Sequence, residues 1–336
     1  MKQSSPNTPN CEIGFKMTDK RGSDCAGVVL MNTIKKHKND NHILKIYYFC
    51  KDMRNFAFIR PDRVNWLQDI CMLRLKKNEY ADGLNLSFGD FPAHSIKPEH
   101  IASLACLIEE FYRSGIHVTL NRNSAVGEIL WSKYRIRQYW AGGQNYAETE
   151  DDRILNLQRI VDEEKELYGR RVSEFLKARY FQKKDMTPVD SSITEALYNI
   201  SDHADAGGNA FSMVMYDDER AELHVAVCDF GKGTARTVKD YLKGDISDGE
   251  ALLKAMEDRF TIGSSSHNGG LGLGNILSSC TEKDYMWIVS NGAILVANAG
   301  NKRIIEMTPE FKGTLVFYSM SLSHFEEEET INDFTW

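Results

Sequence analysis

Two polar residues spaced one helical turn apart are the first candidates for chemistry. Glu195 and Asn199 stand in a segment whose apolar residues recur at helical spacing, and His203 lies one turn further along. Residues at i, i+4 and i+8 share one side of a helix. A carboxamide oxygen can ligate a hard cation, and a carboxylate can orient or deprotonate a water molecule. Taken alone, however, such a stripe is more typical of a solvated helix face.

A second candidate is a carboxylate placed where an apolar strand ends. The segment reads Asp229-Phe-Gly231-Lys-Gly233 and follows a predicted strand at 221–228. A carboxylate there can accept a hydrogen bond from the exocyclic amine of a base. The two glycines let the backbone turn sharply and approach a ligand closely. An ordinary strand-end turn has the same composition, so this motif is also weak by itself.

Two further segments supply backbone N–H groups and a hydroxyl. Glycines at 269–274 precede a predicted helix, and the unpaired N–H groups at a helix start can hold phosphate oxygens. No Lys-Ser/Thr pair follows these glycines, which excludes a Walker A motif, and Asn275 excludes a Rossmann fingerprint. Gly313-Thr314 opens the last predicted strand, where a buried threonine hydroxyl beside Asp229 could complete the recognition of adenine.

The order and spacing of these four segments resemble the GHKL ATPase superfamily, whose members include DNA gyrase, Hsp90, histidine kinases, MutL and the smaller anti-sigma-factor kinases. The resemblance covers about residues 151–322. It implies a Bergerat fold, in which a mixed sheet carries helices on one face and ATP binds beneath a mobile lid. The lid would comprise residues 234–268.

The resemblance also implies a role for each residue that matches the family motifs. Asn199 would bind Mg²⁺ and the phosphates, Glu195 would be the catalytic group that positions or activates the attacking water, and Asp229 would bond the adenine amine. The implied ATP-binding residues are Asn199, Asp229, Gly231, Gly233, Gly270, Leu271, Gly272 and Thr314. Secondary candidates are Asp202, His203, Asn268 and Gly269. The chain departs from the family at Asn268, where the lid-end motif usually begins with glycine, and at Asp202, where histidine kinases usually have a basic residue.

The first half of the chain is predicted to be an α/β domain. Strands and helices alternate at 43–50, 66–75, 83–88, 98–112 and 116–120. This order is typical of a compact α/β unit.

Part of this first half is similar to a STAS domain, the regulatory module of anti-sigma antagonists. The similarity rests on the strand that carries Ser87, the helix from Pro98 and the strand after Gly115, and it covers about residues 43–140. In that family a serine at the start of this helix can be phosphorylated, and Ser95 is the nearest candidate, with Ser87 behind it. A helix-leading serine that is not modified is the ordinary alternative.

The second half begins with a predicted long helix. Apolar residues recur every three or four positions from Asp151 to Phe181, which indicates one amphipathic helix that either packs on its own domain or forms a dimer seam. Beyond it we expect a helix at 191–203, a hairpin of strands at 210–216 and 221–228, a helix at 275–280, and strands at 285–290, 293–297, 303–307 and 314–320. The expected division of the chain is an N-terminal arm (1–40), a STAS-like domain (41–142), a linker with the long helix (143–185), a GHKL domain (186–322) and an acidic tail (323–336).

Composition narrows the class of protein. Of 336 residues, 42% are hydrophobic and 26% charged, which excludes wholesale disorder, and the net charge of -7 argues against a surface that coats nucleic acid. No apolar run approaches the roughly 18 residues of a membrane span, and the polar start lacks a secretory core, so we expect a cytoplasmic protein without a membrane partner. The seven cysteines show no C-x-x-C spacing, so neither a disulfide framework nor a structural zinc site is expected.

Three functions follow from these features. The first is a regulatory switch that binds ATP with Mg²⁺ and hydrolyses it slowly, while lid closure alters interdomain or partner contacts. Glu195 favours this function, because a scaffold needs no carboxylate there. The second is an anti-sigma-type protein serine kinase that acts on a STAS domain, and the third is a nucleotide-binding scaffold without turnover.

A further expected partner is another protein or a second copy of the chain. A histidine kinase is disfavoured because the predicted helix at 151–181 contains no histidine.

Overall fold

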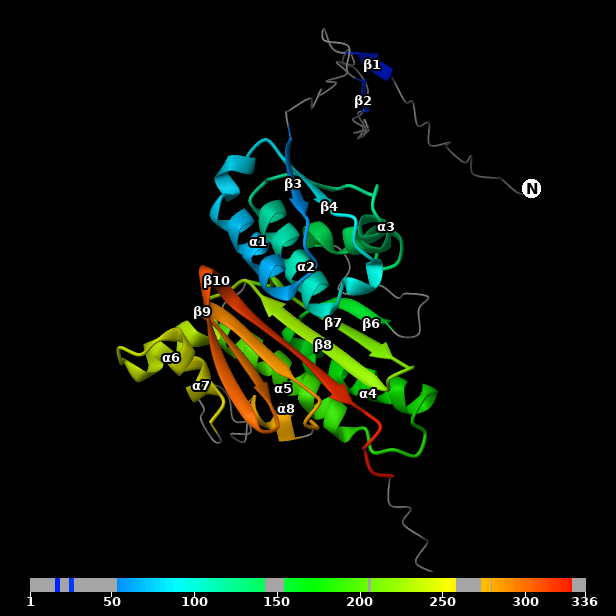
Figure 1. The fold of residues 1–336 in the computed structure, drawn as a ribbon, viewed down its shortest axis with the longest axis vertical. Coiled ribbons are helices and arrows are strands. Elements are labelled where there is room, and N and C mark those ends of the chain that lie inside the picture. The colour runs from blue at the N-terminus through cyan, green and yellow to red at the C-terminus, as the bar shows by residue number, and fades with distance from the viewer. Residues whose placement is uncertain are drawn as a thin grey trace, which may run out of the picture. The chain divides into compact units, whose positions relative to one another are not determined.

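The computed structural model shows an α/β protein, as the sequence predicts (Figure 1). It describes residues 16–18, 24–26, 53–142, 154–204, 207–257, 273–278 and 280–327. The chain divides into two compact units, Met1–Asp52 and Met53–Trp336. In the first unit the described elements are the short antiparallel strands β1 (Lys16–Thr18) and β2 (Asp24–Ala26). The predicted strand at 43–50 lies outside the described residues.

The second unit opens with a three-stranded parallel sheet. Its strands are β3 (Arg54–Phe58), β4 (Leu84–Phe88) and β5 (Val118–Leu120), in that spatial order. Helix α1 (Arg63–Leu75) joins β3 to β4, and helix α2 (Pro98–Arg113) joins β4 to β5. The predicted alternation is therefore confirmed for α1, β4, α2 and β5. Strand β3 is an element that the sequence analysis missed.

Local signals explain where these helices begin and end. The Asp62 side chain accepts a hydrogen bond from the Asn65 N–H and caps α1. Proline occupies the first position of α2, and Gly115, with φ of 75°, follows the end of α2. The remaining elements of this region are α3 (Ala125–Ser132) and the short 3-10 helices Lys77–Tyr80, Ala93–Ser95 and Ile136–Gly142.

A five-stranded sheet follows, and every neighbouring pair of its strands is antiparallel. In spatial order the strands are β6 (Ile154–Arg159), β7 (Ala210–Asp217), β8 (Glu222–Asp229), β10 (Asn301–Ser321) and β9 (Met286–Asn298). The mixed sheet that the sequence predicts is thus not what the described strands form. The hairpin of β7 and β8 is confirmed. In place of the four strands expected between 285 and 320, the structure has two long strands, β9 and β10. Strand β9 is interrupted at Asn291 (φ 51°), and the pairing of β9 with β10 has irregularities in register.

The predicted long helix over 151–181 is wrong in its first third. Residues 154–159 form β6, a 3-10 helix covers Asp162–Glu164, and the helix α4 spans only Lys165–Arg179. Strand β7 offers an edge for backbone pairing, and β6 takes it in antiparallel register. Pairing with a distant strand overrides the local helical period. Helix α4 has 15 residues, so it is shorter than the amphipathic stripe over 151–181 that could have formed a dimer seam.

Helices cover both faces of the five-stranded sheet. On β8 the side chains of Val225 and Val227 enter one core cluster, whereas Ala226 and Cys228 enter the other. The first face is covered by α4 and α5 (Thr187–Ala204), together with α6 (Thr234–Leu242), α7 (Asp248–Ala255) and α8 (Gly274–Ser278). The second face is covered by α1 and α2, which lie across it in Figure 1. The sequence predicted helices on one face, but the N-terminal half supplies a second layer.

This arrangement gives the two halves of the second unit a common hydrophobic core. Trp66 and Leu104 from the N-terminal half belong to the same buried cluster as Phe211 and Phe317 from the five-stranded sheet. The division between a domain ending at 142 and a later domain stays a prediction. In the part of the chain that the structure describes, none of the helices combines the length and the apolar character that a membrane span needs.

Candidate functional site

Helix α5 carries the first pair of predicted site residues. It buries Ile193, Leu197 and Ile200 against the sheet, which leaves Glu195 and Asn199 half-buried at the margin of that apolar face. The Asn199 Nδ2 donates to Glu195 Oε1 over 2.6 Å and to the Glu195 carbonyl oxygen over 2.8 Å. The structure therefore joins the two side chains directly.

The donor set suits a cation held together with phosphates. Because the Nδ2 of Asn199 points at Glu195, its Oδ1 is the atom that can ligate Mg²⁺, which usually takes few protein ligands and keeps phosphate or water oxygens. Among the residues that the structure describes, no cluster of three His, Cys, Asp or Glu side chains could hold a metal by itself. Asp202 and His203 lie in the last turn of α5, and the structure does not describe their side chains.

Asp229 closes strand β8 and is completely buried. One carboxylate oxygen accepts the Gly231 N–H over 2.6 Å, and the other accepts the Thr314 N–H over 3.0 Å. In the register of β8 and β10, Thr314 stands directly opposite Asp229. The structure thus brings together two residues that are 85 positions apart in the sequence.

The Thr314 hydroxyl continues this network to the start of α6. It accepts the Thr234 N–H over 2.9 Å and lies 3.0 Å from the Thr234 hydroxyl. The Ser290 hydroxyl, on the neighbouring strand β9, donates to the Gly313 carbonyl oxygen over 2.9 Å. Sequence reasoning missed Thr234 and Ser290, because a single hydroxyl residue carries no signal until its strand neighbours are known.

Two glycines of this region, Gly233 and Gly313, are required by the packing of the protein itself. Gly233 has φ of 91°, and a Cβ atom there would lie 2.5 Å from Asn291 Oδ1 and 2.7 Å from Ser290 Oγ. Gly313 has φ of 127°, and a Cβ atom there would clash with the Asp229 carbonyl oxygen. The sequence suggested that Gly233 is glycine so that a base can approach the backbone. In the structure, contacts with Asn291 and Ser290 of the same chain already exclude a side chain there.

Burial controls the charge of the Asp229 carboxyl. Burial raises its pKa to about 7, although the hydrogen bonds from Gly231 and Thr314 and the positive charge of Arg74 oppose that rise. Near neutral pH this carboxyl therefore changes between a neutral form and an ionised form that is the stronger acceptor.

Helix α5 and the Asp229–Thr314 pair belong to one face of the sheet. Asp229 follows Val225 and Val227 at alternate positions of β8, and Thr314 precedes Val316 and Tyr318 at alternate positions of β10. The cluster that these residues enter is the one that α5 covers, and α5 contacts both strands.

Several predicted site residues lie outside the described part of the chain. These are Asn268, Gly269, Gly270, Leu271 and Gly272, together with the second part of the predicted lid from 258 onward. The described part of that lid forms α6 and α7, which the Lys239–Asp248 ion pair of 3.0 Å connects. The phosphate-binding roles of the glycines stay predictions.

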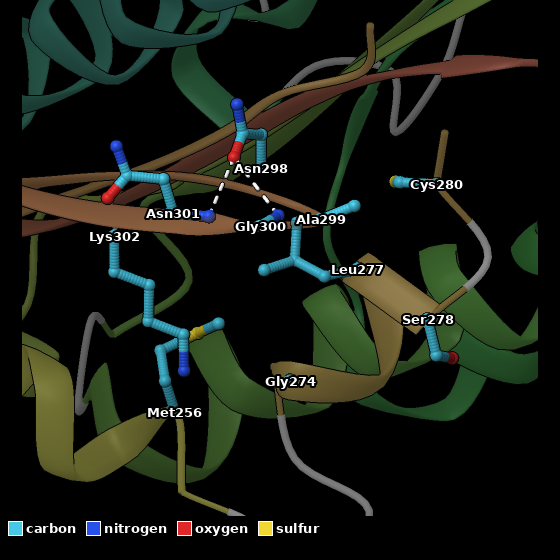
Figure 2. Close-up of a pocket in the computed structure, with 10 residues that line it drawn as sticks. All are labelled: Met256, Gly274, Leu277, Ser278, Cys280, Asn298, Ala299, Gly300, Asn301 and Lys302. Atoms are coloured by element: carbon cyan, nitrogen blue, oxygen red, sulfur yellow. Dashed lines mark hydrogen bonds between the residues drawn. The ribbon is translucent and has the colours of Figure 1, made fainter. Parts of the chain in front are cut away.

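A separate pocket of about 610 Å³ lies between α8 and the turn that joins β9 to β10 (Figure 2). It includes Gly274, Ser278 and Lys302 in its lining, and none of the predicted site residues contributes to it. Asn298 shapes the turn, because its Oδ1 accepts the N–H groups of Gly300 and Asn301 over 3.2 and 2.9 Å (Figure 2). One of its lining residues, Gly274, lies two positions after Gly272, the last of the predicted phosphate-binding glycines.

The two candidate phosphorylation sites occupy different environments. Ser95 ends the 3-10 helix Ala93–Ser95 and is half-buried, two residues before the residue that caps α2. Ser87 lies on β4, and its hydroxyl donates to the Phe56 carbonyl oxygen over 3.3 Å. Of the two, Ser95 is the one that lies shortly before the start of a helix.

A comparison with models of known protein families yields no match, and a comparison with curated proteins yields none either.

Proposed function

We propose that this protein is an ATP-binding regulatory switch of the GHKL type that hydrolyses ATP slowly. The observation that carries the proposal is the buried Asp229 carboxyl, held opposite Thr314 at the end of β8 and β10. It lies on the sheet face covered by the helix that presents the Glu195–Asn199 pair. An acceptor for a base and a carboxylate–amide pair for phosphates are two halves of one nucleotide site.

Each residue has a chemical task in this proposal. Asp229 accepts a hydrogen bond from the adenine amine, and Thr314 supports the base. Asn199 would hold Mg²⁺ through its amide oxygen, and the backbone of Gly270, Leu271 and Gly272 would contact the phosphates. Glu195 orients the attacking water and takes its proton while the water oxygen bonds the γ-phosphorus and the bond to the β–γ bridging oxygen breaks.

The architecture proposed around this site is a Bergerat-type domain joined to a STAS-like N-terminal half. The Glu195-bearing helix on one sheet face and the β7–β8 hairpin that ends in Asp229 support the first assignment. The parallel sheet β3-β4-β5 with α1 and α2 as its crossovers supports the second. The antiparallel sheet and its second covered face are features of this chain that the resemblance did not imply.

The direct test is titration with ATP and Mg²⁺ by calorimetry, combined with measurement of phosphate release. We expect Asp229→Ala and Asn199→Ala to abolish detectable binding. Glu195→Ala should keep binding and lose hydrolysis by about 10² or more, the range that a positioned acid or base contributes. Glu174→Ala, which removes an exposed carboxylate from α4, is the matched control and should leave both measurements unchanged.

Each possible outcome assigns the protein to one class. Phosphate release without labelled protein supports the switch, and equal turnover in the wild type and Glu195→Ala contradicts the role of Glu195. Transfer of label from γ-labelled ATP to protein indicates the serine kinase instead, and Ser95→Ala then tests the acceptor. Binding without either product indicates the scaffold. Absence of nucleotide binding in the wild type would reject the proposal as a whole.

A further inference from the structure

The N-terminal half touches the proposed nucleotide site from behind the sheet. Helices α1 and α2 pack on the face opposite α5, and α1 contacts β10 while α2 contacts β7 and β8. The contacts reach the two short segments that hold Asp229 and Thr314.

Arg74, in the last turn of α1, contacts both of these segments. Its guanidinium carbon lies 3.6 Å from the centre of the Phe230 ring, and Phe230 directly follows Asp229. Its NH1 donates to the carbonyl oxygen of Lys312, two residues before Thr314. The side chain is only 12% exposed, and its Nε donates to Glu110 Oε2 of α2 over 2.6 Å. Glu110 of the N-terminal half therefore fixes the Arg74 side chain, which in turn contacts Phe230 and Lys312 in the C-terminal half.

Helix α2 adds backbone contacts at the same place. The Cys106 thiol lies 3.3 Å from the carbonyl oxygen of Cys228, the residue before Asp229. Asn209 donates from Nδ2 to the Cys106 carbonyl oxygen over 3.0 Å and accepts the Phe230 N–H on its own carbonyl oxygen over 3.2 Å. The residues on both sides of Asp229 are thus tied to the N-terminal half.

We infer that Arg74 is a positioning residue for Asp229, through which the N-terminal half controls the orientation and the ionisation of the nucleotide-binding carboxylate. This inference rests on the proposed function. Docking of α1 and α2 and binding of the nucleotide are then linked, so each favours the other.

The charges around Asp229 support this role. Arg74 lowers the pKa of Asp229 against the effect of burial. From α2, Glu110 pairs with Arg74 and also with Lys77, and Cys106 faces Cys228. Burial raises the pKa of Cys228 well above its ordinary value, so that thiol is neutral. From the other side, Thr314 contributes a backbone N–H and no charge.

The test compares Arg74→Gln with Arg74→Lys and with the control Arg54→Gln, which breaks an exposed ion pair to Glu79 in the same half of the unit. The first readout needs no nucleotide. It is the titration of the Asp229 carboxyl by ¹³C NMR, with the signal assigned from its loss in Asp229→Asn. We expect Arg74→Gln to raise the Asp229 pKa, Arg74→Lys to restore most of the wild-type value, and Arg54→Gln to leave it unchanged.

The second readout is the affinity for ATP with Mg²⁺ between pH 6 and 8.5. If the midpoint moves up by about one pH unit from about 7, the ionised fraction at pH 7 falls from about one half to about one tenth, so the affinity of Arg74→Gln at that pH falls about fivefold. Arg74→Lys should move the midpoint less, yet bind more weakly than the wild type at high pH because it lacks the planar fork and the ring contact.

Two results would overturn the inference. One is an unchanged Asp229 pKa in folded Arg74→Gln, and the other is a raised pKa with unchanged affinity for ATP at every pH. If the wild type binds no ATP, the proposed function fails, while the NMR titration still decides whether Arg74 acts on Asp229. If Arg74→Gln does not fold, Arg74→Lys decides, and an affinity for ATP equal to that of the wild type at high pH would overturn the inference.

Discussion

A carboxyl without any exposed surface is the residue on which this site depends. Asp229 keeps both oxygens bonded to backbone N–H groups, which favours the ionised form, while burial favours the neutral form. The effect of burial is larger than that of the hydrogen bonds, so the pKa of Asp229 rises from 3.8 to about 7. The same group that would recognise a base therefore makes the stability of the protein depend on pH.

We predict the sign of that dependence from linkage. An acid with a raised pKa in the folded state binds its proton more tightly in that state, so its contribution to the free energy of unfolding is fully present below about pH 4 and is lost as the pH rises through about 7. Urea unfolding between these pH values should show a steeper gain on acidification for the wild type than for Asp229→Asn. Identical slopes for both proteins would contradict the raised pKa.

At the scale of elements, α5 is held in position by its crossing with α4. Gly169 of α4 lies so close to α5 that a Cβ atom there would be 2.5 Å from Thr194 Oγ1 and 2.9 Å from the Asp190 carbonyl oxygen. A backbone carbonyl cannot turn aside as a flexible side chain can. Thr194 precedes Glu195, so the spacing between these helices sets where the Glu195–Asn199 pair stands.

We therefore expect Gly169→Ala to lower the free energy of unfolding by about 1–3 kcal/mol, because overpacking at the crossing outweighs the better helix propensity of alanine. Chemical denaturation measures the change. Gly300→Ala is the control, since a Cβ atom there meets nothing within 4 Å, and it should change stability by less than about 0.5 kcal/mol. Equal stability of both variants would show that α4 can move away from α5 without loss.

At the scale of the whole second unit, a buried ion cluster joins its two halves. Glu109 of α2 accepts the Arg159 NH2 of β6 over 3.1 Å and the Arg113 Nε over 2.6 Å. The side chains of Glu109 and Arg159 are 2% and 9% exposed. Arg159 also donates from NH2 to the Tyr139 carbonyl oxygen and from NH1 to the Gly208 carbonyl oxygen. The cluster thus fixes α2 to the outer strand of the sheet.

Removal of the shared carboxylate leaves a buried arginine charge without its counter-ion. We predict that Glu109→Gln lowers the free energy of unfolding by roughly 3 kcal/mol or more. The matched variant Glu128→Gln breaks an ion pair with Arg122 in which both side chains are nearly half exposed, and it should have an effect below about 1 kcal/mol. Thermal unfolding of both variants measures the difference, and a Glu109→Gln protein as stable as the control would rule out a structural role for the cluster.

The elements that sequence patterns predicted well depend on near neighbours in the chain. Helix α2, the hairpin of β7 and β8, and the contact between Glu195 and Asn199 follow from helical period, strand alternation and a four-residue spacing. The position of Asp229 at a strand end belongs to the same group. All of these arise from interactions within about 20 residues along the chain, which the amino-acid sequence displays directly.

Only the tertiary structure decided how distant segments cover one another. Residues 154–159 carry a helical period, yet they pair with β7 because a sheet edge 52 to 61 residues further along the chain offers backbone partners. The N-terminal half covers the second sheet face and brings Arg74 to Phe230, a contact that no local pattern encodes. Such choices depend on the surface that remote segments bury together, so candidate site residues can be proposed from the sequence, whereas the contacts that support them appear only in the folded chain.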